Sequence, residues 1–100
     1  MKHILLVCSA GMSTSMLVKK MQAAAKEKGV EAEIWAVGDA ASASELPKAD
    51  IVFLGPQVRF MQKKMQKAVD GRIPVEVIDM KDYGSMNGKA VLEKALKILD

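Results

Sequence analysis

Short apolar runs alternate with longer amphipathic segments along the whole chain. Continuous apolar runs are typical of strands that are buried on both faces, and alternating patterns are typical of strands near an edge. On this basis we expect β-strands at residues 3–7, 31–37, 50–54 and 75–78, the second of them at or near an edge of the sheet. Helical spacing of apolar residues predicts helices at residues 14–28, 40–46, 57–69 and 89–99. Residues 79–88 are expected to form a loop or a short helical turn.

Strands that alternate with helices are typical of a parallel sheet with right-handed crossovers. We therefore predict a single domain over residues 1–100, with an α/β, flavodoxin-like fold. Its doubly wound, four-stranded parallel sheet has the order 2-1-3-4 and carries helices on both faces. Ligands of such folds bind beyond the carboxyl ends of the strands, near the point where the strand order reverses. The loops of interest are therefore residues 8–15, 55–59 and 79–84.

Residues that are typical of helix ends support these helix boundaries. Ser13 or Thr14 is a suitable N-cap for the first helix, and Gly29 is a suitable C-terminal stop. Pro56 is suited to the first turn of the helix after the third strand.

The only cysteine, Cys8, lies where the first strand is expected to end. It is followed by a run of small or polar residues: Ser9, Ala10, Gly11, Met12, Ser13, Thr14 and Ser15. The main-chain N–H groups of such a loop and the dipole of the following helix favour a thiolate over a thiol. The same groups suit a phosphate dianion. The pattern predicts that the loop activates Cys8 as a nucleophile and then binds its phosphorylated form. The competing interpretation is that Cys8 is a small buried hydrophobe.

Composition excludes several other classes of protein. Half of the 100 residues are hydrophobic, so the chain is not disordered. The net charge of +3 comes mostly from lysines on helices, which argues against a nucleic-acid partner. One cysteine excludes an internal disulfide and a cysteine-based zinc site, and His3 should point to the opposite face of the strand from Cys8. No signal peptide or membrane-inserting segment is evident, so we expect a cytoplasmic protein.

The segment from Cys8 to Ser15 resembles the phosphorylation loop of enzyme IIB of the bacterial phosphoenolpyruvate-dependent sugar phosphotransferase system, in its lactose/cellobiose (chitobiose) branch. The segments 54–57 (LGPQ), 75–79 (VEVID) and 83–84 (YG) match the same family, as does the chain length. The resemblance implies that Cys8 accepts a phosphoryl group from a phosphohistidine of enzyme IIA. It also implies that Cys8 donates this group to a β-linked disaccharide held by the membrane component, enzyme IIC, without a cofactor. Sugar recognition then lies with enzyme IIC, so this chain does not reveal which disaccharide is carried.

Two other functions remain open. Low-molecular-weight tyrosine phosphatases also place a cysteine after the first strand, but an arginine follows it after five residues. Here the sixth residue after Cys8 is Thr14, and residues 9–15 contain no arginine or lysine. A non-catalytic flavodoxin-like domain that binds a nucleotide or flavin phosphate is the second alternative. It has little support, because the chain has neither a Gly-Lys-Ser/Thr motif nor a Gly-x-Gly-x-x-Gly motif.

Several residues outside the Cys8 loop have two interpretations each. One interpretation is a second wall of the site or part of a docking surface, formed by Gly55, Pro56, Gln57 and Tyr83. The other is a simple strand-to-helix turn at residues 55–57, with Tyr83 as a cover for the end of the sheet. Four other residues have open roles: Arg59 as a contact for acidic groups or a solvated side chain, Met12 as a partner contact or packing, Asp79 as a cap, and Trp35 as core or edge cover.

Overall fold

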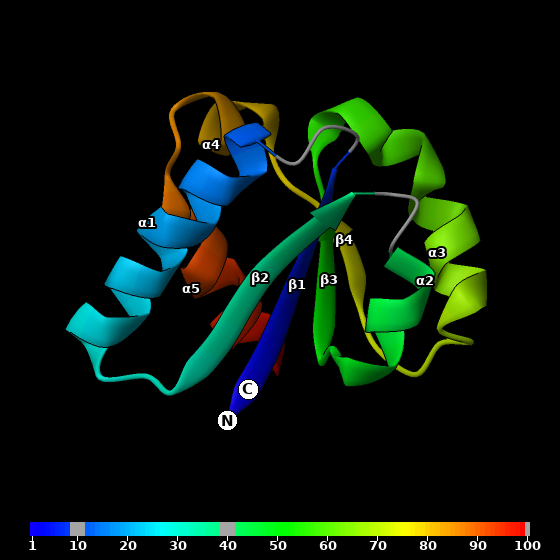
Figure 1. Ribbon diagram of the computed structural model, residues 1–100, viewed down its shortest axis with the longest axis horizontal. Helices are drawn as coiled ribbons and strands as arrows, with labels where there is room; N and C mark the ends of the chain where they lie inside the picture. Colours follow the sequence, from blue (N-terminus) through cyan, green and yellow to red (C-terminus); the bar gives the residue numbers. More distant parts are fainter. Residues whose placement is uncertain (9–11, 39–41, 100) are drawn as a thin grey trace.

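The computed structural model describes residues 1–8, 12–38 and 42–99. They form a four-stranded parallel sheet in the order β2-β1-β3-β4 (Figure 1). The strands are β1 (Lys2–Cys8), β2 (Ala32–Gly38), β3 (Ile51–Leu54) and β4 (Val75–Val77). The predicted flavodoxin-like order is confirmed, and β2 lies at an edge as expected.

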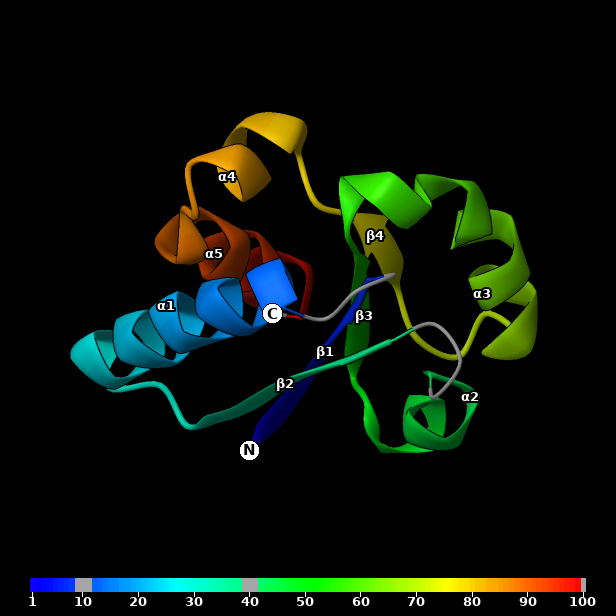
Figure 2. The same ribbon diagram turned by 45° about the horizontal axis from the view of Figure 1, so that its top comes forward.

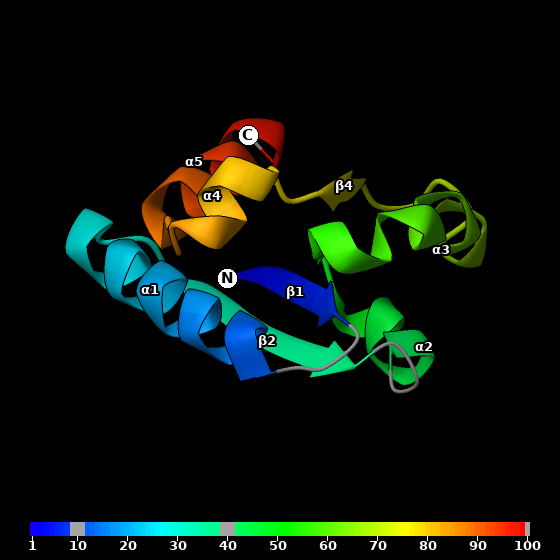
Figure 3. The same ribbon diagram turned by 90° about the horizontal axis from the view of Figure 1, so that it is seen from above.

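Helices cover both faces of the sheet, as Figure 3 shows from above. One face carries α1 (Met12–Lys28), α4 (Met80–Gly84) and α5 (Gly88–Leu99). The other face carries α2 (Ser42–Glu45), the 3-10 helices η2 (Leu46–Lys48) and η3 (Pro56–Met61), and α3 (Gln62–Ala68). Among the described residues, no helix combines the length and the apolar character needed to cross a bilayer.

Alternate residues of β1 point into two separate cores. Ile4 and Leu6 pack with α1 and α5, whereas Leu5 and Val7 pack with the helices of the other face. This alternation places His3 on the face of Leu5, and Cys8 on the face of Leu6. The two residues therefore point away from each other. No group of three or more metal-ligating side chains occurs in the ranges that the structure describes.

The helix predicted over residues 57–69 is two helices, η3 and α3. Val58 interrupts the helical geometry with φ −117° and ψ 23°. Val58 and Met61 are both buried. The three-residue period of a 3-10 helix brings such a pair to the same side, which explains the tighter winding before α3 begins.

Helix α1 begins at Met12, two residues earlier than predicted. Ser13 and Thr14 therefore lie inside its first turn, and neither is the N-cap. Thr14 is fully buried, and its hydroxyl lies beside another side chain.

Two of the shorter predicted segments also differ in detail. Residues 40 and 41 of the helix expected at 40–46 lie outside the described part of the chain. In the described part, this helix begins at Ser42. It continues through Pro47 as η2, because the first turn of a 3-10 helix does not need the missing N–H of proline. The segment 79–88 contains the short helix α4.

Candidate functional site

Cys8 is the last residue of a central strand, at the end of the sheet where all four strands finish. It pairs in register with Gly38 of β2. On the other side of β1, the N–H of Gly55 donates to the carbonyl oxygen of Val7 at 2.9 Å. The chain leaves β1 toward β2 on one side, and β3 lies on the other, so this is the point where the strand order reverses. The location agrees with the rule for ligand sites in open α/β sheets.

Gly55, which sequence analysis placed beside the Cys8 loop, lies close to Cys8 in the structure. A Cβ atom at Gly55 would lie 3.4 Å from Cβ of Cys8 and 3.7 Å from Cε1 of Tyr83. It would also lie 2.9 Å from Oε1 of Gln57. The absence of a side chain at Gly55 therefore lets Cys8, Gln57 and Tyr83 approach one another.

The hydroxyl of Tyr83 joins α4 to the first turn of α1. Oγ1 of Thr14 lies 3.5 Å from the phenolic oxygen of Tyr83, and Thr14 is fully buried. Tyr83 itself is 8% exposed. Sequence analysis considered Tyr83 but missed this contact, because nothing in the local pattern pairs two residues that are 69 positions apart. We refer to Cys8, Thr14, Gly55, Gln57 and Tyr83 together as the Cys8 site.

Cys8 is only 2% exposed. Ser9, Ala10 and Gly11 lie outside the described residues, as do the side chains of Met12 and Ser13. The predicted cup of main-chain donors around the sulfur therefore stays a prediction. Ser15 is exposed on α1. Because Cys8 is buried, access to its sulfur is the property on which any chemistry at this site depends.

An open groove of about 410 Å³ adjoins the Cys8 site. It runs between η3 and α4, which lie on the two sides of the strand ends in Figure 2. Its lining includes Gln57 and Tyr83, so the groove and the Cys8 site share two residues. The remaining lining residues are Pro56, Arg59, Phe60, Met80 and Gly84. The side chains of Phe60 and Met80 are 77% and 72% exposed, and sequence analysis named neither residue.

Asp79 caps α4, as expected from the sequence. Its Oδ1 accepts a hydrogen bond from the main-chain N–H of Lys81 at 2.8 Å. An aspartate at this position satisfies one of the otherwise unpaired N–H groups of the helix. Asp79 thereby has a structural role that fixes the start of the helix bearing Tyr83.

The family model described as "PTS system, Lactose/Cellobiose specific IIB subunit" matches residues 3–94. This chain belongs to that family. A relative from Bacillus subtilis (strain 168), the oligo-beta-mannoside-specific EIIB component, is 51% identical over 100 residues, which are 99% of this chain and 97% of the relative. The galactose-specific EIIB component of Lactococcus lactis subsp. cremoris (strain MG1363) is 43% identical over 105 residues, with the same coverage of the two chains.

A solved structure of a IIB component is also similar to this chain. The cellobiose-specific IIB component of Borrelia burgdorferi is 41% identical and has a TM-score of 0.80, over 98% of this chain and 91% of that one. IIB components are phosphotransferases of the sugar phosphotransferase system. The names of these three IIB relatives refer to three different sugars. Membership of the family therefore does not fix the sugar.

Proposed function

We propose that this chain is a phosphoryl carrier in which the Cys8 thiolate accepts a phosphoryl group from enzyme IIA and passes it to a sugar bound by enzyme IIC. The observation that carries the proposal is the place of the only cysteine, at the carboxyl end of a central strand where the strand order reverses. We infer a cytoplasmic protein that meets enzyme IIC transiently at the inner face of the membrane. No cofactor takes part.

The proposed reaction has two substitutions at phosphorus. In the first, the Cys8 sulfur attacks the phosphorus of the phosphohistidine, the S–P bond forms, and the N–P bond breaks with its electron pair staying on the imidazole. In the second, a sugar hydroxyl oxygen attacks the same phosphorus, the O–P bond forms, and the S–P bond breaks to restore the thiolate. The hydroxyl proton passes to a base on the membrane component or to water. Main-chain amides of residues 9–15 would hold the phosphoryl oxygens between the two steps.

The described neighbours of Cys8 favour a carrier over a phosphatase. Thr14 occupies the position at which the phosphatase pattern has its arginine, and its buried hydroxyl lies beside Tyr83. Arginine stabilises the transition state of phosphoryl transfer by binding two oxygens at once. Without an arginine in residues 9–15, water attacks phosphocysteine slowly, and the arriving partner supplies the missing groups. This arrangement preserves the phosphoryl group until the acceptor is bound.

For the sugar, we propose a β-linked disaccharide. The support is the family and the names of two relatives, which refer to an oligo-beta-mannoside and to cellobiose. The choice among β-linked sugars would be made by enzyme IIC, because the IIB chain contacts the phosphoryl group rather than the sugar ring.

Mass spectrometry after incubation with phosphorylated enzyme IIA tests the proposal. We expect a gain of about 80 daltons, the mass of one phosphoryl group, on the peptide that contains Cys8. The gain should be absent from Cys8→Ser. Addition of enzyme IIC membranes and a β-linked disaccharide should remove it and yield sugar phosphate. A wild-type chain that takes up no phosphoryl group, or takes it up elsewhere, would refute the carrier function.

Access to the buried sulfur is tested separately. We expect a small thiol reagent to label Cys8 in the folded protein much faster than global unfolding permits. The phosphorylated chain should be protected from the reagent, because the sulfur is then occupied. Labelling only at the rate of global unfolding would mean that Cys8 is sealed in the core, and the proposal would fail.

A further inference from the structure

The outer face of η3 and α3 carries a row of cations and one aromatic ring. Phe60, Lys63, Lys64 and Lys67 are spaced at i, i+3, i+4 and i+7, and all four side chains are exposed. Residues at this spacing share one face of a helix. Arg59, next to Phe60, is exposed as well. We refer to these five residues as the basic stripe.

No carboxylate neutralises the basic stripe among the described residues. The ion pairs that the structure shows involve other cations and none of the four in the stripe. Residues 51–69 contain no aspartate or glutamate, and the first carboxylate after them, Asp70, lies beyond the end of α3. The positive charge of the stripe is therefore available to an anionic partner.

The stripe lies on an outer flank of the molecule. The opposite side of η3 and α3 packs on the sheet through Val58, Met61 and Met65. Seen from above, α3 is on the side of the sheet away from α1 (Figure 3). An extended surface can therefore approach the stripe without meeting the helices of the other face.

The chemistry of the stripe is that of a membrane-contacting surface. Lysines attract the phosphates of anionic lipids, and an aromatic ring can enter the boundary between headgroups and acyl chains. Phe60 is 77% exposed and is the one large apolar side chain of the stripe. Since no helix among the described residues could cross a bilayer, the contact is one with the membrane surface.

We propose that the basic stripe binds the surface of an anionic lipid membrane, with the cations on lipid phosphates and Phe60 in the headgroup region. A lipid surface fits better than a nucleic acid, whose binding sites combine several aromatic rings with a basic groove. Ammonium groups bind phosphate as point charges and need no matching shape. The inference does not depend on the carrier function, although it would keep a carrier close to a membrane component.

Co-sedimentation of the full chain with lipid vesicles tests the proposal. Vesicles of phosphatidylcholine alone are compared with vesicles that contain about one third phosphatidylglycerol, which is anionic. One stripe variant removes the ring, Phe60→Ala. The other replaces the three lysines together: Lys63→Gln, Lys64→Gln and Lys67→Gln.

Helix α1 offers a control that removes the same charge from another face. Three of its lysines are exposed and lie outside the ion pairs of the described residues, but Glu27 lies among them. The control variant replaces these three: Lys19→Gln, Lys20→Gln and Lys26→Gln. Both triple variants have the same net charge, so a difference between them reports the place of the charge. Since every substituted side chain is exposed, thermal unfolding should show that all variants are folded.

We expect the wild type to bind the anionic vesicles and not the neutral ones. Each lysine near an anionic surface raises the partition coefficient about fivefold, so the stripe triple variant should bind about a hundredfold more weakly. The α1 triple variant should stay within about threefold of the wild type, since long-range attraction is screened by salt. Phe60→Ala should bind about fivefold more weakly, by a ratio that does not change with salt concentration.

Four results would overturn the inference. The first is a wild type that does not bind anionic vesicles at about 0.1 M salt, where charges still act over about 10 Å. The second is equal binding to neutral vesicles. The third is an equal loss in the two triple variants, which would reflect net charge alone. The fourth is an RNA oligonucleotide that displaces the chain from vesicles at equal phosphate concentration, which would make a nucleic acid the partner.

Discussion

The two ends of β1 carry the only cysteine and the only histidine of the chain, in opposite surroundings. At the amino end, the main-chain N–H of His3 donates to Oδ2 of Asp50 at 2.8 Å, and Nδ1 of His3 lies 3.2 Å from the same oxygen. Nε2 of His3 lies 3.7 Å from Oε2 of Glu33. At the carboxyl end, a Cβ atom at Gly55 would lie within 4 Å of Cys8, Gln57 and Tyr83, and neither Gln57 nor Tyr83 is a carboxylate.

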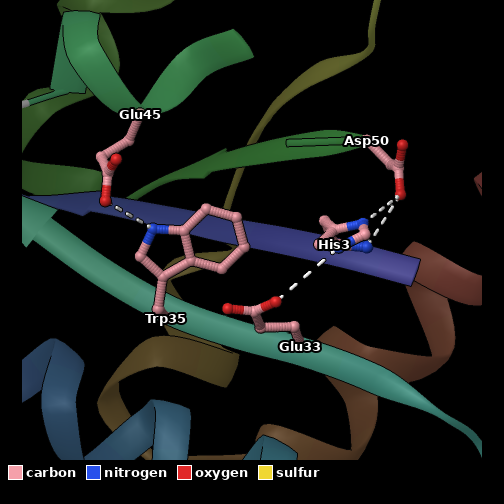
Figure 4. A network of polar contacts seen from close by, with 5 residues as sticks. All are labelled: His3, Glu33, Trp35, Glu45 and Asp50. Carbon is pink, nitrogen blue, oxygen red and sulfur yellow. Dashed lines mark hydrogen bonds and ion pairs between the residues drawn. The ribbon is translucent and has the colours of Figure 1, made fainter. Parts of the chain in front are cut away.

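Figure 4 shows how the charged groups gather on one face near the amino end of the sheet. Nε1 of Trp35 donates to Oε1 of Glu45 at 3.2 Å, and Lys48 donates to the other oxygen of Glu45 at 2.9 Å. The hydrogen bond from the Lys48 ammonium lowers the pKa of Glu45. Trp35 thus covers an edge strand and also joins it to α2.

The contrast indicates that the two ends have different tasks. Carboxylates at the amino end hold strands and helices together. A carboxylate beside Cys8 would instead repel an incoming phosphoryl dianion and raise the energy of phosphocysteine, by Coulomb repulsion in a partly buried place. Neutral, close-packed neighbours avoid that repulsion. The carboxylate contacts of His3 therefore lie at the opposite end of β1 from Cys8.

The largest difference between the two ends is expected when the only cysteine and the only histidine are replaced in turn. We expect Cys8→Ser to reduce phosphoryl uptake from enzyme IIA at least a thousandfold, because a serine hydroxyl is a weak nucleophile without an adjacent base. His3→Gln should leave the uptake rate within about twofold of the wild type. It should lower the free energy of unfolding by only about 0.5 kcal/mol, which is typical of an exposed polar contact.

Quench-flow uptake assays and urea titrations measure these two effects. Cys8→Ala serves as the control for the serine substitution, and should be equally inactive. A His3→Gln chain that no longer accepts the phosphoryl group would show that the amino end also takes part in transfer, and the proposed division of tasks would be wrong.

The second comparison concerns the two glycines that flank Cys8, Gly38 at the end of β2 and Gly55 directly after β3. Among the described residues, a Cβ at Gly38 would meet only the carbonyl oxygen of Cys8, at 3.9 Å, so we expect Gly38→Ala to change neither uptake nor stability. At Gly55, an alanine Cβ would conflict mainly with Oε1 of Gln57, whose exposed side chain can swing away. Gly55→Ala should therefore cost little. The branched side chain of Gly55→Val should push on Cys8 and Tyr83, lower the uptake rate about tenfold or more, and destabilise the fold by about 1–3 kcal/mol.

Backbone strain does not contribute to the effects at Gly55, because its φ of −62° and ψ of 152° are accessible to any residue. Uptake assays and urea titrations of the three variants separate the steric effect from unfolding. If Gly55→Val transferred as fast as the wild type, the close approach of Gly55 to Cys8 would have no bearing on function.

Much of the fold followed from the sequence because strong apolar runs and strong helical patterns alternate. The continuous apolar run of β1 and the small residues after Cys8 were sufficient to predict the strand, its central place and the candidate nucleophile. Asp79 was recognised as a cap by the same local reasoning. These features depend on residues that are neighbours in sequence.

The features that sequence analysis missed depend on distant or non-periodic contacts. Thr14 looked like a helix cap, but its contact with Tyr83 across 69 residues is visible only in three dimensions. The helix pattern over residues 57–69 hid the break at Val58. Phe60 was overlooked because an amphipathic pattern assigns apolar residues to the core, whereas Phe60 lies outside it. The groove forms only when η3 and α4 come together at the same end of the sheet.

The third comparison tests the buried contact at the carboxyl end. Tyr83→Phe removes the hydroxyl that lies 3.5 Å from Oγ1 of Thr14 and leaves that oxygen buried. We expect a loss of about 1 kcal/mol in the free energy of unfolding and a severalfold slower uptake, because the first turn of α1 is less well positioned. Thr14→Val is the matched variant on the other side of the contact.

A double-mutant cycle with Tyr83→Phe and Thr14→Val isolates the contact itself. The double variant should be less destabilised than the sum of the two single variants, since the second substitution removes a partner that is already lost. Additive losses in urea titrations would mean that the two hydroxyl groups do not stabilise each other.

The smallest expected effect is the pH dependence of the charged amino end. The main-chain N–H of His3 donates to Asp50, and this bond lowers the pKa of that carboxyl below its ordinary value. A carboxyl with a lowered pKa in the folded state stabilises the fold above its unfolded-state pKa, about 3.9, and this stabilisation is lost as the pH falls toward the folded-state pKa.

Asp50→Asn should therefore be slightly less stable than the wild type at pH 7, and the gap should narrow as the pH is lowered through about 4. Asp50→Ala removes the hydrogen-bond acceptor as well as the charge, so part of its deficit should persist at low pH. Thermal unfolding across this pH range measures both gaps. A constant gap for Asp50→Asn would show that the charge of Asp50 contributes nothing. Phosphoryl uptake at pH 7 should be unchanged in both variants, because the contact lies at the opposite end of β1 from Cys8.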